Sequence, residues 1–214
     1  MGADDHATLR SIFNLAGNYR DAGRLDEAVT LLDEYLPRAL TVLPPGSPIR
    51  RNGLNGGAET YTRAGRHDKA EPLLRELAYR AKQAGVEPPP YVGRLAVLGQ
   101  NLLQQKKYAA AERVMRECLA ICEKKEPDAW TTFNTQSMLG GALVGQQNYA
   151  EAEPLLLQGY DGMKQRQDKI TPSGKVRLPE ALERLVQLYD ALGQKDKADQ
   201  WRTKLPAERA RKGG

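Results

Sequence analysis

The chain of 214 residues carries 32 Lys and Arg against 27 Asp and Glu, a formal net charge of +5. It contains no apolar run near the ~18 residues that a membrane-spanning helix needs, and its two cysteines are too few for a disulfide framework. The opening residues, MGADDHATL, lack the basic and apolar regions of a signal peptide. We therefore expect a soluble, cytoplasmic protein with no membrane segment.

One short pattern returns five times along the chain: a turn, an alanine and then large apolar residues, which form a pair in the first four copies. The alanines of the five copies are Ala28, Ala70, Ala111, Ala152 and Ala198. They are separated by 42, 41, 41 and 46 residues. A nearly fixed period of this size is typical of stacked repeat proteins.

Each repeat reads as two amphipathic helices joined by a tight turn. In the first repeat, apolar residues recur at helical spacing from Leu9 to Tyr19, and Gly23 then ends the helix. No sustained alternation of apolar and polar residues indicates a strand. We expect an all-α fold: an α–α superhelix, or solenoid, of about five helix-turn-helix repeats and ten helices. We predict one solenoid over 1–214, with repeats at about 5–43, 48–86, 89–125, 127–168 and 177–212.

Two stretches depart from the regular repeat. The glycines and asparagines between Asn52 and Gly57 have poor helix propensity, which predicts a loose first helix in the second repeat. The 46-residue spacing before Ala198 predicts an insertion of about five residues around 169–175.

Candidate catalytic residues are sparse. His6 and His67 stand alone, and Cys118 and Cys122 lie four apart on one helix without a second Cys or His pair to complete a metal site. No glycine-rich phosphate loop follows a strand, and no nucleophile motif is present. The sequence predicts a non-catalytic protein with no cofactor, no metal and two buried thiols.

The repeat resembles the tetratricopeptide repeat, whose signature contains a Leu-Gly pair, a Tyr and then an Ala. Leu98-Gly99 and Leu139-Gly140 supply the first element, and the five alanines supply the last. The Tyr occurs in three repeats, as Tyr19, Tyr61 and Tyr189. A period near 42, longer than the usual 34, is similar to the kinesin light-chain type, as is the opening GADDHATL. The C-terminal repeats also resemble segments that follow the catalytic domain of bacterial Ser/Thr protein kinases.

The resemblance implies a binding surface for a protein or an extended peptide on the concave wall, formed by the first helices of the repeats. Amide side chains suit such a wall, because each can both donate to and accept from a peptide main chain. By register, we expect the lining to be Arg10, Phe13, Asn14, Asn52, Asn55, Glu59, Arg63, Gln100, Leu103, Gln104, Asn134, Ser137 and Gln187. Asn14 falls where the light-chain type commonly has an Asn.

Three other interpretations stay open. The amides are equally consistent with ordinary solvated helix residues. Residues 1–34 carry −4 and the remainder +9, which raises nucleic-acid binding as an alternative, although acids interleave with the bases and no aromatic platform is evident. A structural spacer or self-association module is the third. The resemblance to kinase-linked segments further suggests the docking region of a larger bacterial signalling protein, fused to or associated with a kinase.

Overall fold

A computed structural model describes residues 5–84 and 90–210 of the chain, and all regular structure in these ranges is helical. The chain divides into two compact units, residues 1–86 and 87–214, each of which is described by itself. The all-α class is therefore confirmed. The prediction that residues 1–214 form one continuous solenoid stays a prediction.

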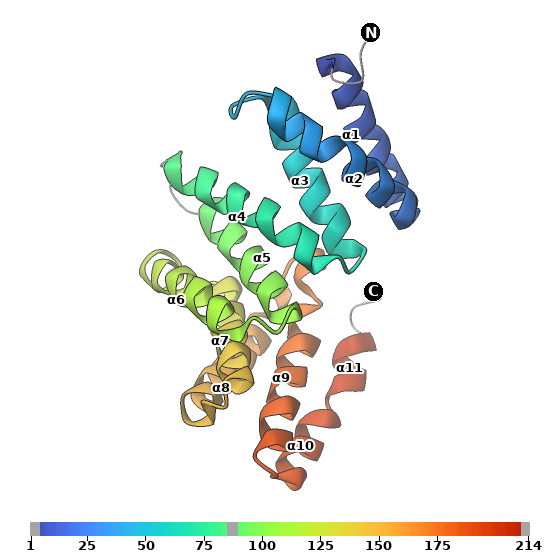
Figure 1. Ribbon diagram of the computed structural model, residues 1–214. Coiled ribbons are helices and arrows are strands. Elements are labelled where there is room, and N and C mark those ends of the chain that lie inside the picture. Colours follow the sequence, from blue (N-terminus) through green and yellow to red (C-terminus); the bar gives the residue numbers. More distant parts are fainter. Residues whose placement is uncertain (1–4, 85–89, 211–214) are drawn as a thin grey trace. The chain divides into compact units, whose positions relative to one another are not determined.

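The first unit contains two helix pairs. Within each pair the helices pack against each other, and α3 also packs against α1 and α2 (Figure 1). The elements are α1 His6–Asp21, α2 Leu25–Val42, α3 Pro48–Arg63 and α4 His67–Gln83.

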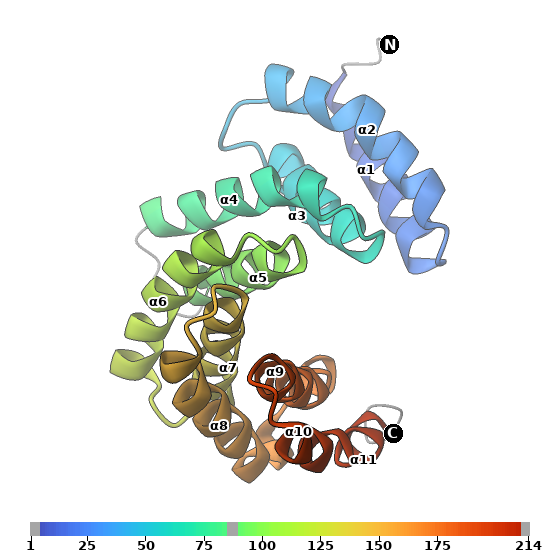
Figure 2. The same ribbon diagram turned by 60° about the horizontal axis from the view of Figure 1, so that its bottom comes forward.

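The second unit contains three helix pairs and a short final helix. Its first helices, α5, α7 and α9, form a wall, because α7 packs against both of the others. Figure 2 shows the remaining helices of the unit, with α11 next to α10 at the end of the chain. The elements are α5 Pro90–Gln104, α6 Tyr108–Lys125, α7 Trp130–Gly145, α8 Tyr149–Gln165, α9 Arg177–Ala191, α10 Lys195–Arg202 and α11 Leu205–Ala210.

The predicted insertion forms two single turns of 3-10 helix between α8 and α9, at Gln167–Lys169 and Pro172–Gly174. Gly174 is buried there, and a Cβ on it would lie 2.8 Å from the Trp130 ring at the start of α7. The extra residues thus fold onto the helix pair instead of forming an extended loop.

The repeated alanines lie at close contacts between helices. All five, from Ala28 to Ala198, are 0% exposed. In the α7/α8 pair, a Cβ on Gly140 would lie 3.2 Å from the carbonyl oxygen of Ala152. Larger side chains at these positions would separate the backbones, because packed interiors have no spare volume. The register deduced from the sequence is therefore confirmed.

The turn inside each helix pair places one residue in the left-handed region. Gly23, Gly65 and Gly193 occupy this position with φ between 69° and 77°. In the α5/α6 and α7/α8 turns the residue is Lys106 or Gln147, with φ of 57° and 63°. One turn geometry therefore serves all five pairs, at some cost in strain where glycine is absent.

The expectation of a loose first helix in the second repeat is wrong, because two of its glycines are packing positions. A Cβ on Gly53 would lie 2.7 Å from the Phe13 ring, and one on Gly57 would lie 3.0 Å from Leu36. These glycines allow α3 to approach its neighbours closely. Gly56 has more room, since the nearest atom to a Cβ there is the end of the Arg20 side chain, at 4.0 Å.

Two repeat-linking clusters use the signature tyrosines. The Tyr61 hydroxyl donates to Asp33 at 2.8 Å, and Lys69 contacts the same carboxylate at 2.7 Å. In the second unit, Tyr189 donates to Glu153 at 2.8 Å, and Lys197 lies 3.9 Å from that carboxylate. The signature tyrosine thus joins a first helix to the second helix of the preceding repeat.

Candidate binding groove

The wall of α5, α7 and α9 encloses a cavity of about 230 Å³. Amide and charged side chains predominate in its lining, with small contributions from Leu103, Tyr108 and Gly141. We call this cavity and its lining the groove. The lining residues are Gln100, Leu103, Gln104, Lys106, Tyr108, Gly141, Glu180, Glu183, Arg184 and Gln187.

Arg184 connects the three helices of the groove. It is only 8% exposed, although the cavity reaches it. Its guanidinium donates to Ser137 Oγ on α7 and to Gln100 Oε1 on α5, both at 3.2 Å. It also lies 3.4 Å from Glu180 on its own helix. The buried cation therefore fixes the orientation of polar groups from each first helix.

Gly141 provides the space that Arg184 needs. A Cβ at this position would lie 2.9 Å from Arg184 Cδ. The aliphatic part of the Arg184 side chain thus crosses α7 directly over Gly141. The absence of a side chain at Gly141 lets the arginine fit between two closely packed helices.

Ion pairs compensate part of the charge in the groove. Burial lowers the pKa of Arg184, and the charge of Glu180 opposes that shift. Arginine stays protonated in proteins, so the groove keeps this positive charge. Glu180 also forms an ion pair with Arg177 at 2.8 Å, and Glu183 forms one with Arg209 at 2.8 Å. Both acidic residues of the lining are thereby held in place by bases.

The second unit brings together four of its six sequence-predicted residues: Gln100, Leu103, Gln104 and Gln187 all line the groove. The expectation that the other two face outward is wrong. Ser137 is 0% exposed and accepts the hydrogen bond from Arg184, and Asn134 is 7% exposed and lines a different cavity.

In the first unit, Phe13 is also misassigned to the surface. It is 6% exposed, because its ring fills the space over Gly53 on α3. Arg10, Asn14 and Asn52 are exposed, as expected for a surface. Asn55 is half-buried and donates to the carbonyl of Arg51 on its own helix at 2.9 Å.

Glu59 and Arg63 belong to an ion-pair cluster that joins α3 to the end of α1. Glu59 lies 3.2 Å from Arg20, and Arg63 lies 3.4 Å from Asp21. The hydrogen bond from Arg20 holds the pKa of Asp21 below its usual value. These side chains already satisfy one another, so this surface differs in kind from the groove of the second unit.

Sequence analysis missed Arg184 and Glu180. The available signal was an arginine within the apolar stripe of α9, where Ala181, Leu185 and Leu188 are fully buried. A charged residue at such a position must find polar partners, because an unpaired buried charge is costly.

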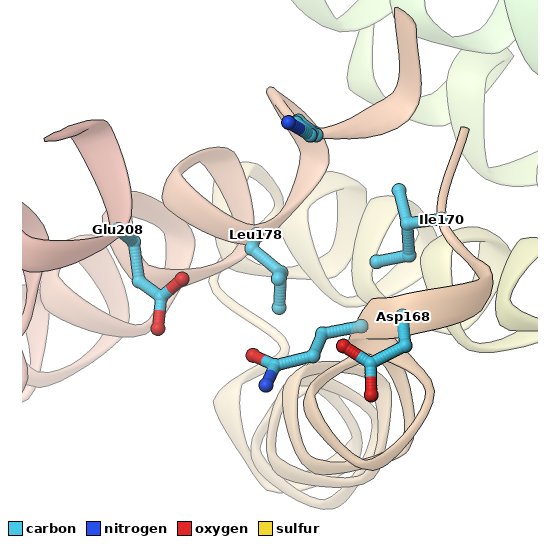
Figure 3. Close-up of a pocket in the computed structure, with 6 residues that line it drawn as sticks. Asp168, Ile170, Leu178 and Glu208 are labelled. Carbon is cyan, nitrogen blue, oxygen red and sulfur yellow. The ribbon is translucent and has the colours of Figure 1, made fainter. Parts of the chain in front are cut away.

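A third cavity, of about 430 Å³, lies beside the insertion (Figure 3). Figure 3 shows Leu178 between Glu208 on one side and Asp168 and Ile170 on the other. Glu208 is buried and bonded to Lys164 at 2.6 Å, and Lys164 also donates to Gln167 at 2.9 Å. Much of the polar lining therefore serves to hold α11 and the insertion in place.

Within the part of the chain that the structure describes, no three His, Cys, Asp or Glu side chains are grouped so that they could hold a metal ion. Cys118 and Cys122 are both buried free thiols, as the sequence predicts. Across residues 5–84 and 90–210, no helix combines the length and apolar character that crossing a bilayer requires.

Family models of the tetratricopeptide repeat match this chain at residues 8–49 and 93–126, and a second such model matches residues 58–76. The chain contains tetratricopeptide repeats. Repeats of this kind are typically non-catalytic scaffolds suited to protein–protein interaction. No curated protein sequence matches the chain significantly.

Solved structures share the fold of this chain. The kinesin light-chain TPR-like repeats of Podosopora anserina match at a TM-score of 0.67 and 23% identity, over 99% of this chain and 98% of that one. BtubC (BKLC) from P. vanneervenii matches at a TM-score of 0.63 and 21% identity, over 98% of this chain and 82% of that one. A Rap protein complexed with competence and sporulation factor matches at a TM-score of 0.53 and 14% identity, over 97% of this chain and 65% of that one. The resemblance to kinesin light-chain-like repeats is thereby confirmed at the level of fold.

Proposed function

We propose that this chain docks an extended segment of a partner protein in the groove formed by α5, α7 and α9. The observation that carries the proposal is the convergence of Gln100, Gln104 and Gln187 around the buried Arg184. Each amide has both a donor and an acceptor, so together they suit the main chain of an extended peptide.

The arrangement favours a segment rather than a large flat partner. The cavity of about 230 Å³ is concave and small, and its polar groups come from three separate helices. Because Arg184 is held by Ser137, Gln100 and Glu180, the groups nearest to it are ordered before a partner arrives. Such preorganisation lowers the entropic cost of binding. The Rap protein of the same fold, solved with competence and sporulation factor, supports a partner-binding role.

The more specific predictions stay open. The link to a Ser/Thr protein kinase rests on sequence resemblance alone. The cytoplasmic location rests on composition alone. In the first unit, Arg10, Asn14 and Asn52 stay predicted partner contacts, and Asn14 remains the first choice among them.

The test uses peptides selected from a random display library against the purified chain. The dissociation constant of each selected peptide is then measured for wild type and for a variant with Gln100→Ala, Gln104→Ala and Gln187→Ala. Each amide contact contributes roughly 0.5–1.5 kcal/mol, so removing three should weaken binding by about tenfold or more.

The matched control replaces three glutamines that are exposed on second helices of the same unit, with Gln158→Ala, Gln165→Ala and Gln200→Ala. We expect this control to bind like wild type. Equal affinities for the groove variant and the control would contradict the proposal and place the binding surface elsewhere.

A further inference from the structure

A separate cavity of about 240 Å³ opens among α5, α6 and α7. Its walls are mainly apolar and include Val92, Ala96, Ile121 and Trp130. Cys122, Thr131, Asn134 and Thr135 supply its few neutral polar groups, and Lys125, Glu126 and Arg177 also contribute to the lining. Apolar walls with a few fixed polar groups are typical of small-molecule sites.

Asn134 gives this cavity an unused hydrogen-bond acceptor. The side chain lines the cavity and is 7% exposed, yet its Oδ1 has no hydrogen-bond partner among the described residues. Leaving a buried polar atom unpaired costs roughly 1–3 kcal/mol. Oδ1 is itself covered, so the Asn134 amide must turn toward the cavity for a bound donor to reach it and recover that cost.

The size of the cavity limits its occupant. An apolar cavity of ~150 Å³ is large enough to bind benzene. A cavity of about 240 Å³ can therefore hold a bicyclic ring, and its apolar walls favour such a ring over a polar compound of equal size.

The cavity is distinct from the groove. The two share no lining residue, and an ion pair of 2.8 Å joins Arg177 at the rim of the cavity to Glu180 in the groove. The occupant of the cavity is therefore better sought among separate molecules.

We propose that this cavity binds a small, mostly apolar molecule of bicyclic size that donates one hydrogen bond to Asn134 Oδ1. The apolar walls supply most of the affinity, and Asn134 selects compounds that carry an N–H or O–H donor. The site does not depend on the groove, so each proposal can fail without the other.

The probes are indole and 1-methylindole, which share the ring system and differ in the N–H donor. Their dissociation constants are measured by isothermal titration calorimetry with the full chain. We expect wild type to bind indole about fivefold to tenfold more tightly than 1-methylindole, the value of one net hydrogen bond. The variant Asn134→Leu should lose this preference, because it keeps the volume and removes the acceptor.

A second variant guards against a folding defect. Ala96→Phe fills the cavity from α5 and should abolish binding of both probes, whereas Ala150→Phe, an exposed alanine on α8, should leave binding unchanged. Thermal melts followed by circular dichroism identify any variant that is not folded.

Cys122 supplies an independent readout. It lines the cavity, and a hydrogen bond from Cys118 lowers its pKa to about 7, whereas the same contact and burial raise the pKa of Cys118. Alkylation by iodoacetamide should therefore occur at Cys122 first. Saturating indole should slow that reaction at least severalfold.

Several outcomes would overturn the proposal: no binding of either probe, equal affinity of both for wild type, or full affinity in Ala96→Phe. Loss of indole binding in the triple groove variant would show that the cavity is not independent. Displacement of indole by a groove-selected peptide would assign the cavity to the docked segment instead.

Discussion

The first-helix surfaces of the two units use similar residues in different ways. In the first unit, Arg20, Asp21, Glu59 and Arg63 pair with one another on the surface, where each ion pair is at least partly solvated. In the second unit, a single arginine, Arg184, is buried and holds polar groups from three helices around a cavity.

This difference indicates where binding energy is available. Exposed ion pairs contribute little and are screened by salt. A buried guanidinium beside the amides of Gln104 and Gln187 can instead give a partner stronger, directional contacts, because the surrounding dielectric is low. The groove of the second unit is therefore the better candidate for docking, although the first unit carries as many polar residues on its first helices.

The largest expected effect concerns the α7/α8 pair of the second unit. A Cβ on Gly159 would lie 2.7 Å from the Ser137 backbone nitrogen and 2.8 Å from the Phe133 carbonyl oxygen. Backbone atoms cannot move aside as a side chain can, so Gly159→Ala should lower the free energy of unfolding by about 2–3 kcal/mol. Urea denaturation followed by circular dichroism measures this change.

Gly56 in the first unit is the matched control, since the nearest atom to a Cβ there is the end of the Arg20 side chain, at 4.0 Å. Gly56→Ala should stabilise that unit by about 0.5–1 kcal/mol through helix propensity alone. Destabilisation by both substitutions to the same extent would show that the two units do not differ in packing at these glycines.

A smaller, pH-dependent effect is expected from Tyr189. Burial and the hydrogen bond to Glu153 raise the pKa of Tyr189 to about 12, above the ordinary value of ~10. Its contribution to stability is therefore complete below ~pH 10 and is lost as the pH rises toward 12. Tyr189→Phe should cost roughly 0.5–1.5 kcal/mol at neutral pH and make the loss of stability between pH 10 and 12 shallower.

The control for this prediction is Tyr79 in the first unit, which is 61% exposed. Tyr79→Phe should leave the free energy of unfolding at neutral pH unchanged. If the free energy of unfolding of Tyr189→Phe fell between pH 10 and 12 as steeply as that of wild type, the hydrogen bond between Tyr189 and Glu153 would not contribute to stability as described.

The repeat positions were predictable from the sequence because they depend on one period. Ala28 and its four counterparts mark the contacts between paired helices, and Tyr61 and Tyr189 mark links between repeats. The alanine contacts follow from spacing along a single chain, since a helical period fixes which side of a helix faces its partner. The tyrosines were identified only through the resemblance to the repeat signature.

The outward-facing residues were less predictable because their burial depends on the neighbouring repeat. Asn134 and Ser137 occupy first-helix positions similar to those of exposed residues elsewhere, yet helices on either side of α7 cover them. Gly141 could not be identified as the space for Arg184 without the distance between α7 and α9. The sequence therefore shows which residues could line the groove, but not how deeply each of them is buried.

The most direct test of the groove is photo-crosslinking with a benzophenone amino acid placed at three exposed positions in turn: Gln104 in the groove, Gln158 on α8 and Asn14 on α1. Each variant is irradiated with a peptide selected against the wild-type chain, and crosslinks are identified by mass spectrometry. Docking in the groove predicts strong crosslinking from Gln104 and none above background from Gln158, and crosslinking from Asn14 in addition would extend the contact to the first unit. Crosslinking from Asn14 or Gln158 without any from Gln104 would contradict it.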